Sequence, residues 1–241
     1  MDAPEGLADL IRVEPKPEPT APDYDFHHDV YARGEDAIRH LAGLAPLHKW
    51  PGPPIRKRVE SVAEVTPAML RDYPYWTRAM PALHRAYGGY CAYLARYIEL
   101  VETPTTDHFV ALQNSTDIFL AYTWSNYRLA TPWVNGAKSD FSDVLDPFEI
   151  GEEWFALDLG SYKTVVGPKA PRDQEVAIRT TINRLGLDRS EVCVERRRAA
   201  QKYLSPPLGK PPVPLWSLEL DQPFVAYELR RQGRLRPEDQ P

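Results

Sequence analysis

The residues of this sequence best suited to chemistry are an adjacent aspartate and histidine, Asp107 and His108, in the segment TTDHFVAL. The preceding threonines, Phe109 and Val110 favour a β-strand, and neighbouring side chains on a strand point to opposite faces. The pair therefore predicts a division of labour, in which Asp107 holds a divalent metal on one face and His108 activates a water on the other. An aspartate–histidine dipeptide also arises readily by chance, so this pattern is weak on its own.

Two asparagines and a lysine follow in the segment YTWSNYRLATPWVNGAK, at Asn126, Asn135 and Lys138. The segment predicts a strand end and then a helix, with Asn126 in the turn that enters the helix and Asn135 pointing inward two turns later. Lys138 lies three residues beyond Asn135, on the same helical face. Pro132 limits where this helix can begin. The alternative is that Asn126 is a helix cap and Asn135 a loop residue.

The order of these residues resembles the ββα-metal core of HNH endonucleases. The resemblance rests on the Asp-His pair, then Trp-x-Asn-Tyr (residues 124–127), then Asn-x-x-Lys (135–138). The later segments DVLDPFEIGEEWFALDL (143–159) and TINRLGLDRSEVCVERR (181–197) are similar to those that follow this core in bacterial HNH proteins of the retron and Septu (PtuB-like) defence type. The resemblance covers residues 87–203, about half of the chain.

This resemblance implies a role for each residue. Asp107 and Asn135 would be the ligands of one Mg²⁺ or Mn²⁺ ion, and His108 would be the general base. Asn126 would hold the His108 loop through backbone hydrogen bonds, and Lys138 would contact phosphate. Such chemistry needs a deprotonated water and neutralised phosphate charge; a neutral imidazole can supply the first and a hard cation on oxygen ligands the second.

The chain also departs from the family pattern. Ala111 and Leu112 stand where family members often carry Pro-Lys. Many HNH proteins hold a structural zinc with paired cysteines, but here Cys91 is the only cysteine left near the core, and Cys193 lies far from it. We therefore expect no structural zinc, and packing must hold the fold.

The implied function is a metal-dependent DNA endonuclease, the effector of an anti-phage system that acts with an SMC- or ABC-like ATPase subunit (PtuA-like). One alternative is a catalytically inactive HNH-like scaffold kept as a partner-binding module, for which Ala111 and Leu112 are the best support. Another is a soluble regulatory protein in which the motifs are accidental.

The predicted fold class is α+β and mostly helical, with the ββα-metal core embedded in helices. Residues 1–24 are predicted to be a flexible Pro/Glu-rich tail and residues 25–87 a helical N-terminal region. Residues 88–204 would form the nuclease core with its helical tail, and residues 205–241 a Pro-rich extended segment with a short C-terminal helix.

Individual elements are predicted from hydrophobic period and from helix start and stop signals. Helices are expected at 27–44, in short pieces between 66 and 87, at 173–185, from 188 to about 204, and at 224–232; strands are expected at 154–158 and 162–166. The first helix has candidate core positions at Val30, Ile38 and Leu41. The apolar run 90–101 is compatible with either a strand or a buried helix.

Composition limits the partners. The net charge of −5 argues against a broad DNA-binding surface, so a local basic cleft or a partner must hold the DNA. Arg196, Arg197 and Arg198 are predicted to be exposed on a helix, either as a solvated face or as a DNA-backbone patch. Without a signal peptide or an apolar membrane span, the chain is expected to be cytoplasmic and to have no membrane partner. The proline-rich segments 1–24 and 205–241 are expected to dock on another protein; the alternative is that they pack back on this chain.

Overall fold

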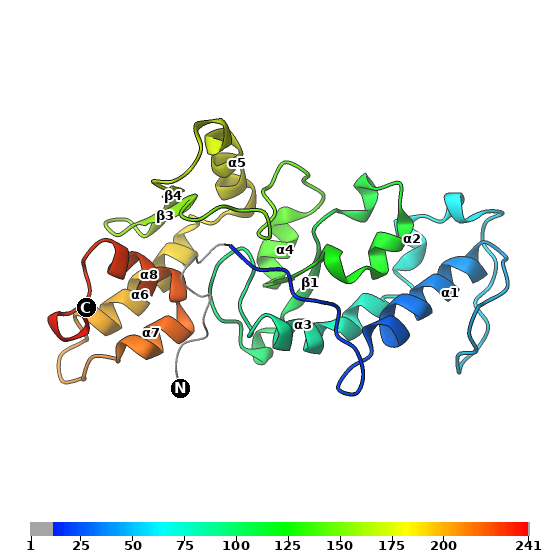
Figure 1. Cartoon of the computed structure of the whole chain (residues 1–241), viewed down its shortest axis with the longest axis horizontal. Helices are drawn as coiled ribbons and strands as arrows, with labels where there is room; N and C mark the ends of the chain where they lie inside the picture. The colour runs from blue at the N-terminus through cyan, green and yellow to red at the C-terminus, as the bar shows by residue number, and fades with distance from the viewer. Residues whose placement is uncertain (1–11, 241) are drawn as a thin grey trace.

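Two small antiparallel sheets are set among helices in this α+β protein, as the computed structural model shows (Figure 1). The structure describes residues 12–240. The strands are β1 (Thr105–His108), β2 (Tyr127–Ala130), β3 (Phe155–Asp158) and β4 (Lys163–Val166). The α-helices are α1 (Ala32–Leu41), α2 (Pro67–Leu70), α3 (Met80–Ala86), α4 (Pro132–Lys138), α5 (Glu175–Leu185), α6 (Ser190–Leu204), α7 (Leu215–Asp221) and α8 (Pro223–Arg231).

A strand–strand–helix unit lies at the centre of the molecule. Strand β1 pairs antiparallel with β2, so that Asp107 lies opposite Arg128 and His108 opposite Tyr127. Helix α4 follows β2 after Thr131, and Pro132 occupies its first turn, where its fixed φ and missing N–H suit a helix start. The predicted ββα order is therefore present as a backbone arrangement.

The helix of this unit begins later than predicted. Asn126 ends a 3₁₀ turn (Trp124–Asn126) that precedes β2, and it does not lie in the turn that enters the helix. The physical reason is Pro132, which prevents a helix from continuing through it and so fixes the start of α4 there. Only one turn of α4 separates Pro132 from Asn135.

The N-terminal half follows the predicted helices closely. A π-helical turn (His27–Tyr31) continues into α1, and Val30, Ile38 and Leu41 are all buried as expected. Residues 90–101 form neither the strand nor the buried helix that the sequence allows. Gly88 and Gly89 have positive φ, and the chain then folds into a tight turn in which Tyr90 bridges Tyr97.

The C-terminal half also matches the prediction in most elements. The β3–β4 hairpin, α5 and α6 are all found, and Gly186 ends α5 with φ of 61°. Helix α6 begins at Ser190, two residues after the predicted start at 188. Helix α7 was not predicted. It begins immediately after Pro214, the last proline of the extended segment 205–214.

Side chains of the LDPF and TINRLGLDR segments hold the core and the C-terminal half together. Asp146 accepts both hydrogen bonds of a bidentate pair with Arg128 on β2, 2.8 Å from Nε to Oδ1. The LDPF segment is also bonded to the TINRLGLDR segment, because the Leu145 N–H donates to the Thr181 hydroxyl at 2.8 Å. These two sequence segments therefore have a structural reason to occur together.

Arg196 corrects a sequence-based expectation. It was predicted to be exposed with Arg197 and Arg198, but only 2% of it is exposed. Its guanidinium donates to the Thr164 hydroxyl and to the Leu187 carbonyl, each at 2.9 Å. The helical period places it on the inner side of α6, where it joins the helix to the β3–β4 hairpin.

The proline-rich ends pack on this chain at residues 12–24 and in the helices after Pro214, whereas residues 207–212 are exposed. Residues 12–24 run along the core: the Val13 N–H donates to the Pro147 carbonyl at 2.9 Å, and the Trp124 indole donates to the Lys16 carbonyl at 2.8 Å. Residues 1–11 of the predicted tail lie outside the described residues. At the other end, Leu218 and Phe224 are buried in the core. Within residues 12–240, no helix has both the length and the apolar character needed to span a membrane.

Candidate functional site

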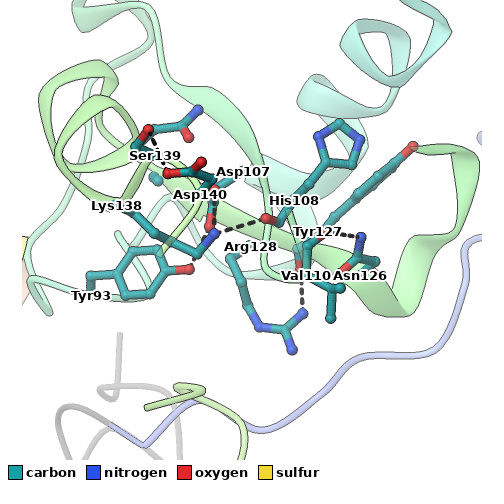
Figure 2. A network of polar contacts seen from close by, with 12 residues as sticks. Tyr93, Asp107, His108, Val110, Asn126, Tyr127, Arg128, Lys138, Ser139 and Asp140 are labelled. Carbon is teal, nitrogen blue, oxygen red and sulfur yellow. Dashed lines mark hydrogen bonds and ion pairs between the residues drawn. The ribbon is translucent and has the colours of Figure 1, made fainter. Parts of the chain in front are cut away.

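Asp107 and Lys138 form a buried ion pair in the ββα unit (Figure 2). Asp107 is 2% exposed, and Lys138 is fully buried. The Lys138 Nζ lies 3.2 Å from Asp107 Oδ1 and 2.8 Å from the backbone oxygen of His108. The second carboxylate oxygen accepts a hydrogen bond from the Tyr93 hydroxyl. Both oxygens of Asp107 are thus engaged inside the protein.

The fold explains how these groups meet. Asp107 and Thr105 share one face of β1 because side chains alternate along a strand. Helix α4 contacts that face, and Lys138, its last residue, reaches Asp107. Tyr93 comes from the tight turn after Gly89. Burial, together with the negative charge of Asp107, raises the pKa of Tyr93 well above its usual range. The phenol therefore stays protonated and donates a hydrogen bond to Asp107.

His108 lies on the opposite face of β1. Its ring contacts the Trp76 and Tyr127 rings edge to face, with centroids 5.3 Å apart in both cases. The His108 Nε2 lies 2.9 Å from the Ala121 carbonyl, which can only accept, so Nε2 carries the proton and Nδ1 keeps its lone pair. Within residues 12–240, Nδ1 has no hydrogen-bond partner, and burial lowers the pKa of this imidazole below 6.5.

This arrangement suits a proton acceptor. The imidazole is neutral at physiological pH, one nitrogen is fixed by a backbone carbonyl, and the other is an open acceptor. His108 is half-buried between aromatic rings. The two aromatic contacts mean that the ring also contributes to packing, beside its open nitrogen.

Asn126 holds the loop that follows His108. Its Oδ1 accepts from the Val110 N–H at 2.8 Å, while its Nδ2 donates to the Val110 and Leu120 carbonyls at 3.1 and 3.2 Å. The Phe109 N–H also donates to the Asn126 backbone oxygen, at 2.8 Å. These are backbone hydrogen bonds of the kind that the resemblance implies for this residue, and they explain why an amide, with its donor and acceptor, is needed there.

Replacing Asn126 with Ala should destabilise the fold measurably. The change leaves the Val110 N–H and two carbonyls without their partner, and a buried unsatisfied group costs about 1–3 kcal/mol. We expect a loss of about 2–4 kcal/mol in the free energy of unfolding. Urea unfolding checks this, with Asn114→Ala as the control, since Asn114 is exposed. Equal stability of the two variants would contradict the clamp.

Asn135 lies on the same face of β1 as Asp107 but does not reach it. Its Nδ2 donates to the Thr105 hydroxyl at 3.1 Å, and its side-chain oxygen has no donor within residues 12–240. Thr105 lies two residues before Asp107 on the strand, so the two expected ligands face one side of the sheet. No contact joins them directly.

The residue types at this site suit a hard divalent ion, but their present contacts do not. Asp107 and Asn135 offer the oxygen donors that Mg²⁺ and Mn²⁺ prefer. However, Lys138 and Tyr93 occupy both carboxylate oxygens. Residues 12–240 also contain no group of three or more His, Cys, Asp or Glu side chains able to hold a metal. The Lys138 ammonium supplies the positive charge beside Asp107, where the resemblance places a metal.

Lys138 also differs from its expected role as a phosphate contact. Its side chain is fully buried, and its ammonium is turned toward Asp107 and the His108 carbonyl. A phosphate outside the protein cannot reach it in this conformation. The reason is the position of Lys138 on α4, which packs this face of the helix against β1.

Cys91 sits in an apolar setting near the start of α4. Burial raises the pKa of its thiol, and the nearby backbone N–H groups of Tyr93, Leu94 and Thr131 oppose that rise. Leu94 and Val134 are buried as well. Packing and backbone hydrogen bonds hold this corner of the ββα unit.

Comparison of the chain with protein-family models, curated proteins and solved structures finds no match. The resemblance to HNH endonucleases therefore rests on the sequence motifs alone.

Sequence reasoning did not identify several residues that build the site. Tyr93, which donates to Asp107, lies in an apolar aromatic run with no period to mark it. Trp76, which packs on His108, comes from the N-terminal region. Arg128 could have been suspected, because a charged residue in an otherwise buried strand needs a partner, and Asp146 in the LDPF segment is that partner.

Proposed function

We propose that this chain is an HNH-type phosphodiester hydrolase that acts on DNA. The observation that carries the proposal is His108, a neutral imidazole at the end of β1 with one nitrogen held by the Ala121 carbonyl and the other open. The Asn126 clamp on the following loop and the position of α4 on the Asp107 side support it. The order of the residues along the chain, Asp-His, then Asn, then Asn-x-x-Lys, resembles that of the HNH core.

The chain's own residues would divide the work as follows. His108 Nδ1 accepts a proton from a water, and the bond from Nε2 to Ala121 keeps the ring in the tautomer that allows this. Asn126 keeps the loop after His108 in place. Family resemblance implies Mg²⁺ or Mn²⁺ at Asp107 and Asn135, but the carboxylate is occupied by Lys138. Cation binding at Asp107 would require Lys138 to release the carboxylate.

Nicking of a supercoiled plasmid tests this function. The purified chain is incubated with Mg²⁺ or Mn²⁺, alone and with the proposed ATPase subunit, and conversion to the open-circular form is followed on a gel. Conversion that needs the divalent ion supports the proposal. No conversion in any of these mixtures would contradict it.

The rate of nicking should depend on pH in a defined way. Only the neutral imidazole can accept a proton, and burial lowers the pKa of His108 below 6.5. We expect kcat/KM to stay level as the pH falls from 8 to about 6.5 and to drop only below that, because the free enzyme loses its base there. An acid limb centred above pH 7 would contradict this assignment of the base.

A defence role with an SMC- or ABC-like ATPase subunit is the proposed setting. The net charge of −5 is consistent with a chain that needs a partner to hold the DNA. Residues 12–24 and the helices after Pro214 pack on this chain, so docking through the proline-rich ends is proposed for the exposed residues 207–212 alone. Co-purification of the full chain with such an ATPase, together with the nicking assay, tests the partnership.

A second candidate function is a catalytically inactive HNH-like scaffold that binds a partner. The observation that favours it is the buried Lys138–Asp107 pair, which supplies a cation from within the chain. Ala111 and Leu112, in place of the family's Pro-Lys, agree with it. The nicking assay separates the two candidates.

A further inference from the structure

Basic side chains without acidic partners gather around Tyr162 at the turn of the β3–β4 hairpin. The Arg197 guanidinium lies over the Tyr162 ring, 5.6 Å from its centroid. The positive charge of Arg234, from the loop after α8, opposes the rise in the pKa of Tyr162 that burial causes. Lys163 follows Tyr162 on β4, and Arg197 and Lys163 both lie close enough to Cys193 to influence its thiol.

The cations of this group make no ion pair with the described carboxylates. Lys163, Arg197 and Arg234 are exposed, and none has a carboxylate within 4.0 Å in residues 12–240. Elsewhere, exposed cations such as Arg58, Lys169 and Arg184 do pair with carboxylates.

Asp188 also acts on the Cys193 thiol, but it lies more than 4.0 Å from every cation nitrogen in residues 12–240, and two other nearby carboxylates have partners elsewhere. Asp158 lies opposite Lys163 in the hairpin, but it accepts from Gly160 and Ser161 within its own turn. Glu195 lies toward Arg96, 3.9 Å from its Nε. The positive charges around Tyr162 therefore remain available to an external anion.

A rigid base supports this group. Arg196 lies beneath it and donates to the Tyr162 and Leu187 carbonyls, at 3.4 and 2.9 Å, and to the Thr164 hydroxyl. It too lacks a carboxylate within 4.0 Å among the described residues. These bonds fix α6 against the hairpin, so Arg197 and Tyr162 are presented from two elements that cannot easily separate.

We propose that Lys163, Arg197 and Arg234 form a binding face for the phosphate backbone of DNA, centred on Tyr162. The inference rests on the proposed function for its choice of polyanion. The net charge of −5 argues against DNA binding over the whole surface. A small face of unpaired cations can still provide phosphate contacts. Guanidinium groups suit this role, since their planar donors match phosphate oxygens.

DNA binding at varied salt tests the face. Fluorescence anisotropy with a labelled duplex compares the full wild-type chain with the double variant Arg197→Glu/Arg234→Glu. The matched control is Arg71→Glu/Arg85→Glu, two exposed arginines of the N-terminal half with the same change of charge. Removing phosphate contacts weakens binding and lowers the slope of log K against log salt by about 0.9 for each contact. We expect affinity to fall on the order of tenfold or more and the slope to drop by about 2 in the face variant.

Several outcomes would overturn the proposal. These are wild-type affinity in the face variant, an equal loss in the control, or no DNA binding by the wild type at low salt. Binding of phosphatidylserine vesicles that is lost in the face variant while DNA binding persists would assign the face to a lipid surface. Thermal unfolding verifies that each variant folds, and Arg197→Lys/Arg234→Lys should keep most of the affinity. His108→Ala should bind DNA like the wild type, so loss of cleavage and loss of the face are separate results.

Discussion

His108→Ala should reduce plasmid nicking by about 10²–10⁴, the usual cost of losing a general base. The substitution removes the only acceptor nitrogen that the end of β1 offers, while the Asn126 clamp and the Lys138–Asp107 pair stay in place. The rate is measured in single-turnover nicking with Mn²⁺ and with Mg²⁺.

Stability must be measured beside the rate, because His108 packs on Trp76 and Tyr127. We expect His108→Ala to lose about 1–3 kcal/mol, mainly from the cavity, since the Ala121 carbonyl keeps the Tyr127 hydroxyl as a donor at 2.8 Å. His84→Ala is the matched control: His84 also bonds a backbone carbonyl, that of Ile98 at 2.9 Å, and its ring also meets a tyrosine, Tyr97. We expect the two variants to lose similar stability, and only His108→Ala to lose nicking. That result would assign the loss of nicking to the role of His108 as a base. Normal nicking by a folded His108→Ala protein would remove His108 from the mechanism.

Lys138→Met should have the largest effect on stability. It leaves the Asp107 carboxylate buried without a counter-ion, and breaking a buried pair in this way costs about 3–5 kcal/mol. That is a large share of the roughly 5–15 kcal/mol that holds a typical domain folded. Urea or thermal unfolding measures it, with Arg58→Met as the control, since the Arg58–Asp72 pair is exposed and should matter little.

A second variant keeps this prediction testable if Lys138→Met fails to fold. Adding Asp107→Asn removes the unpaired charge, so the double variant should recover much of the lost stability. Mn²⁺ should raise the melting temperature of Lys138→Met more than that of the wild type, since the carboxylate becomes free and a ligand that binds the folded state stabilises it. Unchanged stability in Lys138→Met, or no recovery in the double variant, would contradict a buried ion pair.

Much of the fold follows from local patterns in the sequence. Helices α1, α5 and α6 and the β3–β4 hairpin carry clear periods and stop signals such as Gly186, so their places could be predicted. The ββα order could be predicted for the same reason, because the strand propensity around Asp107 and the proline at the start of α4 are local features.

The contacts that define the site could not be read in this way. The meeting of Lys138 with Asp107 and Tyr93 joins three segments, and no local pattern says which face of α4 will turn inward. Arg196 shows the same limit: three consecutive arginines look like one exposed patch, yet the helical period turns one of them into the interior. The packing of residues 12–24 depends on acceptors and donors far along the chain, such as Trp124.

Metal-dependent cleavage by the purified wild-type chain is the most direct test of the proposed HNH activity. Supercoiled plasmid is incubated with the chain and its proposed ATPase subunit in Mn²⁺, with His108→Ala beside it and with an arm in which EDTA removes the ion. We predict conversion to open-circular DNA by the wild type only, and none in EDTA. Conversion that is equal in the wild type and a folded His108→Ala protein, or absent from the wild type with both Mn²⁺ and Mg²⁺, would contradict the account.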